Sequence, residues 1–277
     1  MDIASFLGVI IGIVCVVISI LLDGSLMQFF NVPSIFIVLG GGFASTLISY
    51  RLNEVINVFI VVKKAFFGKS ESPINTIKLL VNLSQKARRE GLLALENFLD
   101  KTDDHLMKKG LQLLVDGVDR EYLESCMLSK IYQSHKRHRT GASMISMLAS
   151  VAPGLGLVGT YVGLIPMLVN MRDPDKLGPL MAIELVSSFY GGFMANVIFS
   201  PMAKKLIIKS EQEKERNELI LEGILSIHEG KNPKIIREEL QAYLVKKEAE
   251  KISQARQKSS NENPDKKVVD YRERKGA

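Results

Sequence analysis

The chain alternates between long apolar stretches and charged blocks. Residues 3–22, 32–50 and 140–171 contain no charged side chain, and residues 177–203 contain only Glu184. A helix needs roughly 20 apolar residues to cross the hydrocarbon of a bilayer. All four stretches meet that length, so the pattern predicts four transmembrane helices in an all-α integral membrane protein.

The charged block after the second stretch has helical periodicity, with apolar residues every three or four positions and no strand pattern. Ser72 and Pro73 suit an N-cap and first turn, ahead of a helix from Ile74 to about Leu99. Shorter helices are predicted at about 104–116 and 119–136. A helix at the inner membrane surface is predicted from the spacing of Val55, Phe59, Val62 and Phe66.

The third stretch is too long for a simple span. Its 32 uncharged residues would form a helix of about 48 Å, against about 30 Å of hydrocarbon. We therefore expect its lower part to emerge into the cytoplasm, covered by neighbouring helices. The fourth stretch continues past Pro201 as a charged helix to about His228, with Gly230 as its C-cap. Pro233 then starts a helix expected over Ile235 to about Lys251.

Lysine and arginine set the orientation. Of 36 such residues, none lies in residues 1–50, 16 lie in 51–139, two lie in 172–176 and 18 lie from 204 onward. Because cytoplasmic loops carry the excess of these residues, both charged blocks and both termini are expected in the cytoplasm. The same topology explains the net charge of +6 without a nucleic-acid partner.

These assignments divide the chain into five parts. A transmembrane hairpin occupies residues 1–50, and a large helical cytoplasmic domain occupies 51–139. The third and fourth transmembrane helices, extended into the cytoplasm, occupy 140–203. Cytoplasmic helices follow over 204–252, and a disordered tail with little to bury occupies 253–277.

The third stretch contains the pattern G-x-G-x-x-G over residues 154–159. It lies inside an apolar run rather than between a strand and a helix, so nucleotide binding is not expected. Small residues instead let helix backbones approach closely in lipid. Gly156, Gly159 and Gly163 are therefore predicted to support tight packing in an oligomer or against a partner.

Recognisable catalytic, cofactor-binding or metal-ligand patterns are missing from the sequence. We therefore expect a protein that is not an enzyme and that holds no cofactor or metal. His135 and His138 share a helix face without cysteine or carboxylate ligands nearby, and they are interpreted as part of a solvated basic face.

Four polar side chains near the middle of the third stretch and in the fourth are candidates for function. Thr160, Ser187 and Ser188 either bond to carbonyls of their own helices or line a polar path. Glu184 is an acid in a membrane helix, where a charge at the centre costs about 2.5 to 3.5 kcal/mol. It is placed either at the outer mouth of a path or in an interhelical bond.

Two prolines lie toward the inner halves of these spans. Pro153 and Pro201 each remove a backbone donor and can kink their helices. Their matching depth predicts a hinge at the cytoplasmic boundary.

Five segments then stand in a recognisable order: Ala87–Glu96, Val151–Gly163, Met181–Gly191, Ala195–Ala203 and Gly230–Ile236. Together they resemble the A subunit of the bacterial flagellar motor stator, of the MotA and PomA type. The TolQ and ExbB energy transducers are similar at greater distance. The resemblance extends over residues 1 to about 250.

The resemblance implies a ring of copies, expected to be a pentamer, around two single-span helices of a MotB-type B subunit in the bacterial inner membrane. The ion-carrying Asp of that family belongs to the B subunit. Thr160 and Ser188 match hydroxyl positions of its ion path, and Pro153 and Pro201 match prolines that couple ion transfer to movement. The implied function is an ion channel that converts ion flow into torque on the rotor.

A charged segment matches the part of the family that engages the rotor switch protein FliG. Arg88 and Glu96 are the matching residues, with Arg89 beside them. On a regular helix Arg88 and Glu96 would lie about 12 Å apart along the axis.

Two departures bear on the transported ion. Ser187 and Ser188 stand where two threonines are frequent in the family, and Glu184 stands where a small residue is usual. H⁺ is the favoured ion, and Na⁺ stays open. Two other functions also stay open: a TolQ- or ExbB-like energy transducer of the cell envelope, and an autonomous ion channel or transporter. The large block after the second stretch, rather than after the first, favours the stator.

Overall fold

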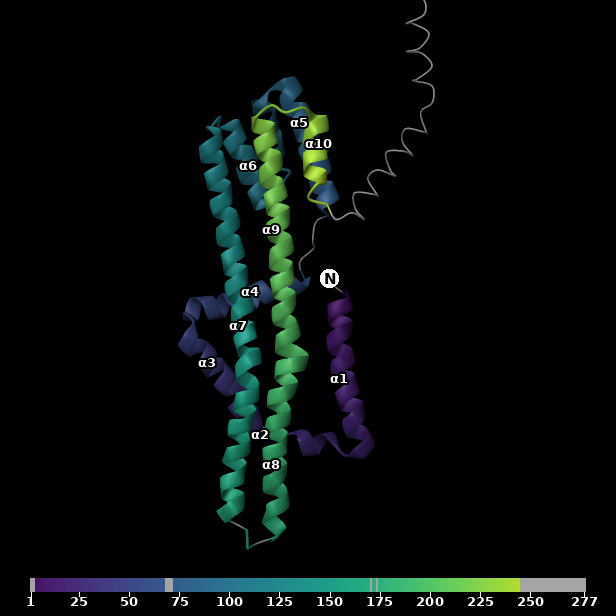
Figure 1. The fold of residues 1–277 in the computed structure, drawn as a ribbon, viewed down its shortest axis with the longest axis vertical. Helices are drawn as coiled ribbons and strands as arrows, with labels where there is room; N and C mark the ends of the chain where they lie inside the picture. Colours follow the sequence, from purple (N-terminus) through teal and green to yellow (C-terminus); the bar gives the residue numbers. More distant parts are fainter. Residues whose placement is uncertain (1–2, 68–71, 170, 173, 245–277) are drawn as a thin grey trace, which may run out of the picture. The chain divides into compact units, whose positions relative to one another are not determined.

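The computed structural model describes residues 3–67, 72–169, 171–172 and 174–244 (Figure 1). Over these residues the chain is built from helices and connections, without a strand, which confirms the predicted all-helical class. The chain forms two compact units. The first takes its described residues from Met1–Lys69 and Gln133–Glu213, and the second from Ser70–Tyr132 and Lys214–Ala277.

The first unit begins with α1 (Ile3–Asp23) and the 3₁₀ turn η1 (Leu26–Phe29). A continuous helical run follows, made of α2 (Val32–Ile35), the π-helix η2 (Phe36–Gly40) and α3 (Gly41–Ser49). Asn31 caps the start of this run by accepting the backbone N–H of Ser34. The second predicted span is therefore helical throughout, and its turns widen at η2.

The same unit contains α4 (Leu52–Phe67), α8 (Pro174–Phe193), the π-helix η4 (Met194–Phe199) and parts of α7 (Arg120–Val169) and α9 (Ser200–His228). The predicted helix after the second span is confirmed as α4. Its buried side chains pack between α7 and α9 in a cluster formed by Val55, Val58, Ala142, Met144, Ile145, Ala203 and Leu206.

The π-helix η4 accommodates Pro201, the second residue of α9. A proline has no N–H to donate and clashes with the carbonyl of the preceding turn. The helical hydrogen bonds lengthen to a five-residue spacing just before Pro201: the Ser200 N–H donates to the carbonyl of Ala195, five residues back. The side-chain amide of Asn196 donates to the carbonyl of Gly192 at 2.9 Å, which satisfies a polar group that would be costly to leave unpaired in lipid.

Helix α7 is longer than the sequence pattern predicts. The expected helix over 119–136 and the third apolar stretch form one helix of 50 residues, Arg120–Val169. Polar residues between 133 and 140 mark a change of surroundings, but that segment contains neither proline nor glycine to end a helix. Pro153 lies inside α7 without dividing it.

Three helical runs of the described chain are long and apolar enough to cross a membrane: Val32–Ser49, Arg120–Val169 and Leu180–His228. Helix α1 contributes a shorter apolar stretch, Leu7–Leu22. Length and composition therefore support the second, third and fourth predicted spans. The first span, over α1, stays a prediction.

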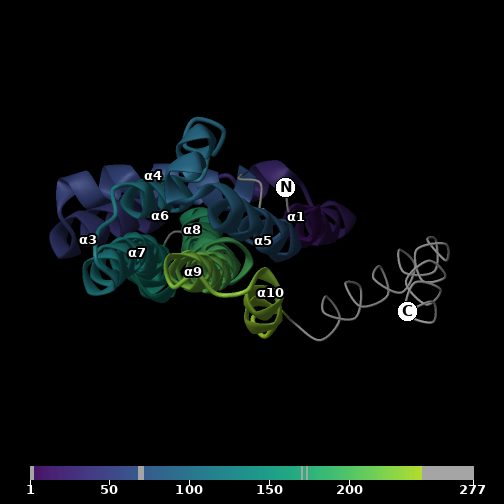
Figure 2. The ribbon, with the colours of Figure 1, turned by 90° about the horizontal axis from the view of Figure 1, so that it is seen from above.

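The second unit packs around one apolar core. Its elements are α5 (Pro73–Glu90), the 3₁₀ segment η3 (Leu92–Phe98), α6 (His105–Val115), α10 (Pro233–Gln241), the start of α7 and the end of α9. Figures 1 and 2 show α10 beside α5 and the C-terminal end of α9. Side chains with no exposed surface fill the centre, namely Leu80, Leu95, Leu111, Leu114, Leu123, Met127, Ile220, Ile224, Ile236 and Leu240.

Local signals located several helix ends correctly. Ser72 and Pro73 begin α5, and the helix predicted at 104–116 is α6, whose N-cap Asp104 accepts two backbone N–H groups at 2.9 Å. The helix predicted to run to Leu99 is wrong beyond Glu90, because Gly91 turns the chain with φ of 86°. The last predicted helix ends at Gln241 rather than Lys251, and the predicted disordered tail lies outside the described residues.

Gly230 ends α9 as predicted. With φ of 67°, it lets its own N–H donate to the carbonyl of Ile227 at 3.0 Å and the Lys231 N–H donate to Ser226 at 3.1 Å. This pair of bonds is a Schellman motif, which satisfies the last carbonyls of the helix. The chain then reverses and enters α10 at Pro233.

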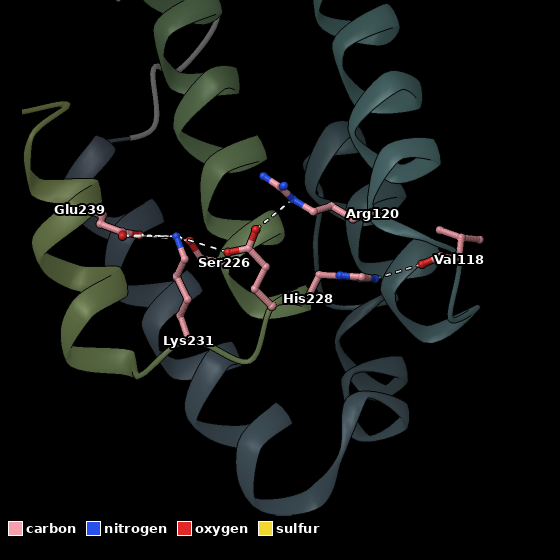
Figure 3. Close-up of polar contacts among 7 residues, drawn as sticks. Val118, Arg120, Ser226, His228, Lys231 and Glu239 are labelled. Carbon is pink, nitrogen blue, oxygen red and sulfur yellow. Dashed lines mark hydrogen bonds and ion pairs between the residues drawn. The ribbon is translucent and has the colours of Figure 1, made fainter.

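Polar contacts fasten α10 to this turn (Figure 3). The Lys231 ammonium lies 3.1 Å from Glu239 on α10 and 3.4 Å from Glu229. Its hydrogen bond to Glu239 raises the pKa of Lys231. Glu229 also pairs with Arg120 at 2.9 Å, and the buried Ser226 hydroxyl donates to Glu239 at 3.3 Å. The network links α9, α10 and the first turn of α7.

Candidate functional site

Helices α7 and α8 lie side by side with their backbones almost in contact (Figure 1). A Cβ atom on Gly156 would lie 3.0 Å from the carbonyl oxygen of Ser187 and 3.2 Å from the Cα of Gly191. On the facing side, a Cβ on Gly191 would lie 2.7 Å from the carbonyl oxygen of Ala152. Only glycine permits this approach, because backbone atoms cannot rotate away.

The other two predicted packing glycines face side chains of α8. A Cβ on Gly159 would lie 2.6 Å from the Cβ of Ser187, and a Cβ on Gly163 would lie 2.8 Å from the Cγ of Glu184. All three glycines thus line the α7–α8 contact within one chain. Their predicted role in oligomer or partner packing stays a prediction.

The three hydroxyl groups have different surroundings. Thr160 is half-buried, and its Oγ1 donates to the carbonyl of Leu157 at 2.6 Å. Ser187 is fully buried, and its Oγ lies 2.6 Å from the Oγ of Ser34. Ser188, the next residue along α8, is half-buried. The back-bond weighed for an isolated hydroxyl is therefore found at Thr160, and an interhelical bond is found at Ser187.

Glu184 lies one turn before these serines on α8 and is half-buried. Within the described structure its Oε1 atom is buried and has no hydrogen-bond partner. A carboxylate oxygen buried without a partner is costly in a membrane helix, and such residues mark ion paths. Glu184 therefore has the surroundings of a side chain that binds a cation, a proton or a partner protein.

The two prolines predicted as hinge residues are both exposed. Pro153 sits within the unbroken α7, and Pro201 follows the widened turns of η4. The altered backbone at η4 is a local irregularity of the kind at which membrane helices bend. The hinge itself stays a prediction.

The predicted rotor contacts lie on the second unit. Arg88 and Arg89 occupy the last turn of α5, and Glu96 occupies η3, with all three exposed. The regular helix assumed for their spacing is wrong, since Gly91 separates the two elements. Arg88 and Glu96 therefore come from two elements that meet at a turn.

The interpretation of the two α7 histidines as a solvated face is wrong. The side chain of His135 is 19% exposed and that of His138 is 15% exposed. His135 bonds to Ser210 at 3.0 Å, and His138 lies 3.2 Å from Glu213, both on α9. The partners lie 75 residues away in the sequence, so local spacing carried no signal of the pairs.

Sequence reasoning also missed the partners of Ser187 and Tyr190 on the N-terminal hairpin. Ser34 bonds to Ser187, and the Tyr190 hydroxyl donates to the carbonyl of Phe29. The pattern Asn31-x-x-Ser34 at the start of an apolar run is a readable capping signal. Among the described residues, no group of three or more His, Cys, Asp or Glu side chains is placed to hold a metal ion.

Comparison with known proteins identifies the family of the chain. The profile of the MotA/TolQ/ExbB proton channel family matches residues 99–219. The chain is 36% identical over 244 residues to chemotaxis protein PomA of Vibrio alginolyticus, covering 88% of this chain and 96% of that protein. It is also 36% identical over 252 residues to motility protein A of Treponema phagedenis, covering 91% and 97%.

The chain belongs to the MotA/TolQ/ExbB proton channel family.

Solved structures agree with this membership. The chain superposes on a chain of the flagellar MotAB stator complex from Bacillus subtilis with a TM-score of 0.84 at 32% identity. The match covers 91% of this chain and 99% of that chain. A chain of MotAB from C. jejuni gives a TM-score of 0.83 at 26% identity, covering 89% and 97%. The family resemblance inferred from the five sequence segments is confirmed.

Proposed function

We infer that this chain is the A subunit of a flagellar motor stator, which converts ion flow across the membrane into torque on the rotor. The observation that carries the inference is its likeness to a chain of the MotAB stator complex from Bacillus subtilis, with a TM-score of 0.84 over 91% of this chain. Relatives named chemotaxis protein PomA and motility protein A match it over 96% and 97% of their own lengths.

The ion-carrying carboxylate comes from a partner. The four apolar stretches hold a single acid, Glu184. An ion path needs a group that binds and releases the ion within the membrane. A MotB-type B subunit with an Asp in its single span supplies that group, and a pentameric ring of this chain surrounds two copies of it.

The chain crosses the bacterial inner membrane four times. Helix α1 supplies the first span, and the three long apolar runs supply the others. The lysine and arginine distribution supports a cytoplasmic position for both termini and for the charged blocks. The functional parts are the hairpin of residues 1–50, the torque domain 51–139, the extended helices 140–203, the cytoplasmic helices 204–252 and the tail 253–277.

The ion path runs along α7 and α8, where Thr160 and Ser188 offer half-buried hydroxyl oxygens. The hydrogen of Thr160 is engaged by the Leu157 carbonyl, which leaves the lone pairs of its oxygen for water or an ion. Glu184 adds a negative charge at the outer mouth. H⁺ is the ion we propose, because the matching family is described as a proton channel family.

Binding and release of the ion move the inner halves of α7 and α9, and Pro153 and Pro201 act as the hinges for this movement. Torque then passes to FliG through Arg88, Arg89 and Glu96. The turn at Gly91 presents the two arginines and the glutamate from adjacent elements, α5 and η3. Their exposed charges are free to pair with opposite charges on the rotor.

Complementation of a deletion strain tests this function. Cells that lack the chain should keep their filaments but not swim, and the unsubstituted chain should restore swimming. Arg88→Glu or Glu96→Lys should reduce swimming speed to about half or less, since like charges facing each other across an interface repel. A matching reversal on FliG should restore part of the speed. Lys130→Glu, at an exposed lysine of α7, is the control and should swim normally.

Two results would contradict the proposal. Normal swimming of the Arg88 and Glu96 variants would remove their rotor role. Loss of filaments in the deletion strain would place the chain in filament assembly instead of torque generation.

A further inference from the structure

Two serines that are 153 residues apart in the sequence meet in the interior of the first unit. Ser34 of α2 and Ser187 of α8 are each 0% exposed, and their Oγ atoms lie 2.6 Å apart. Two hydroxyls buried together at this distance share one hydrogen, so one of them donates and the other accepts.

The capping residue of α2 fixes the direction of this bond. The Oδ1 atom of Asn31 accepts the backbone N–H of Ser34 at 3.0 Å and the Ser34 hydroxyl at 2.8 Å. A serine hydroxyl carries a single hydrogen, so Ser34 has none left for a second acceptor. Ser187 must therefore donate to Ser34, and the hydrogen bonds run from Ser187 to Ser34 to Asn31.

Helix α7 also packs against Ser187. A Cβ on Gly159 would lie 2.6 Å from the Cβ of Ser187 and 2.7 Å from its Oγ. Ser187 is thus enclosed between the backbone of α7 and the start of α2. Ser187 has no exposed surface, whereas Thr160 and Ser188 are half-buried.

A second contact holds the same segment to α8. The hydroxyl of Tyr190, one turn after Ser187, donates to the carbonyl of Phe29, and the Phe29 ring meets the Phe189 ring edge-on at 5.4 Å. Residues 29–34 are therefore fastened to one face of α8 at two successive turns.

We propose that Ser34 is a positioning residue for ion transfer: its bond to Ser187 fixes the rotation of α8 about its axis, so that Ser188 faces the ion path. Successive residues on a helix differ by about 100°, so a helix held with Ser187 against α2 and α7 turns Ser188 to a different side. The half-buried state of Ser188 agrees with this. The inference rests on the proposed stator function, and it separates Ser187 from the residues that meet the ion.

Proton flux through vesicles that contain this chain and its B-type subunit tests the proposal. Ser34→Ala, Ser187→Ala and the double variant each remove the same hydrogen bond. All three should need an external proton concentration about fivefold higher for half-maximal flux per assembled complex, with no further shift in the double variant. Ser150→Ala, which removes an exposed hydroxyl of α7, is the control and should match the unsubstituted complex.

The alternatives give different patterns. If Ser187 bound the ion, Ser187→Ala and the double variant would lose flux while Ser34→Ala kept it, which would overturn the proposal. If the bond served only to hold the fold together, the variants would lower the amount of assembled complex without changing the proton concentration for half-maximal flux. That result would also overturn the proposal. If Ser34→Ala did not assemble, Ser187→Ala would report the same bond from α8. Absence of flux in the unsubstituted complex would instead reject the stator function and this inference together.

Discussion

Replacing Gly191 by alanine is expected to disrupt the α7–α8 contact. The added Cβ would lie 2.7 Å from the carbonyl oxygen of Ala152 and 3.0 Å from the Cα of Gly156, and both are backbone atoms. Because no side-chain rotation relieves this collision, the helices must separate. Overpacking costs about 1 to 3 kcal/mol and sometimes more. The thermal midpoint of the purified complex should fall by about 6 to 12 °C for a 3 kcal/mol loss.

Gly192 provides a matched control on the same turn of α8. A Cβ there would meet nothing within 4 Å. Since alanine favours a helix over glycine by about 1 kcal/mol, Gly192→Ala should leave the midpoint unchanged or raise it. The pair Gly156→Ala and Gly154→Ala repeats the comparison on α7, with Gly154 in open space. Equal midpoints for Gly191→Ala and Gly192→Ala would show that the backbones do not meet as described.

Thr160→Val is expected to reduce ion flux by about tenfold or more. Valine keeps the shape of threonine but removes the oxygen, and leaving a partner group unsatisfied in a buried polar path costs about 1 to 3 kcal/mol. Thr160→Ser keeps the oxygen and should conduct within about twofold of the unsubstituted protein. The measurement is proton flux per assembled complex in vesicles.

Thr140 is the control for Thr160. It lies on the same helix and makes the same kind of bond, from its hydroxyl to the carbonyl four residues back, Lys136, at 3.0 Å. Thr140→Val therefore removes an equivalent back-bond outside the proposed path and should conduct normally. Normal flux through Thr160→Val would exclude its oxygen from the path.

Local signals in the sequence were sufficient for helix ends that depend on nearby residues. Gly230 ends α9 through bonds to carbonyls three and five residues away, and Ser72 with Pro73 begins α5. Gly91 was missed for a physical reason. Apolar residues continue beyond it at similar spacing in η3, so the periodicity of this 3₁₀ segment resembles a continuation of the α-helix.

Contacts between distant segments could not be predicted. Nothing near His138 in the sequence indicates Glu213, and nothing near Ser34 indicates Ser187, 153 residues later. Such pairs depend on how α2, α7, α8 and α9 pack, which the apolar pattern of one helix does not specify. The candidate path residues could be named from resemblance, whereas the different surroundings of Ser187 and Ser188 required the structure.

Ion flux with and without a B-type subunit tests the central claim, that this chain conducts only with a carboxylate supplied by a partner. Vesicles would hold the purified chain alone or together with the B subunit, at about 100 mV, where each transferred charge releases about 2.3 kcal/mol. We expect no flux above empty vesicles from the chain alone, and proton flux with the partner that disappears when the Asp in the partner's span is replaced by Asn. Flux from the chain alone that is lost in Glu184→Gln would contradict the claim.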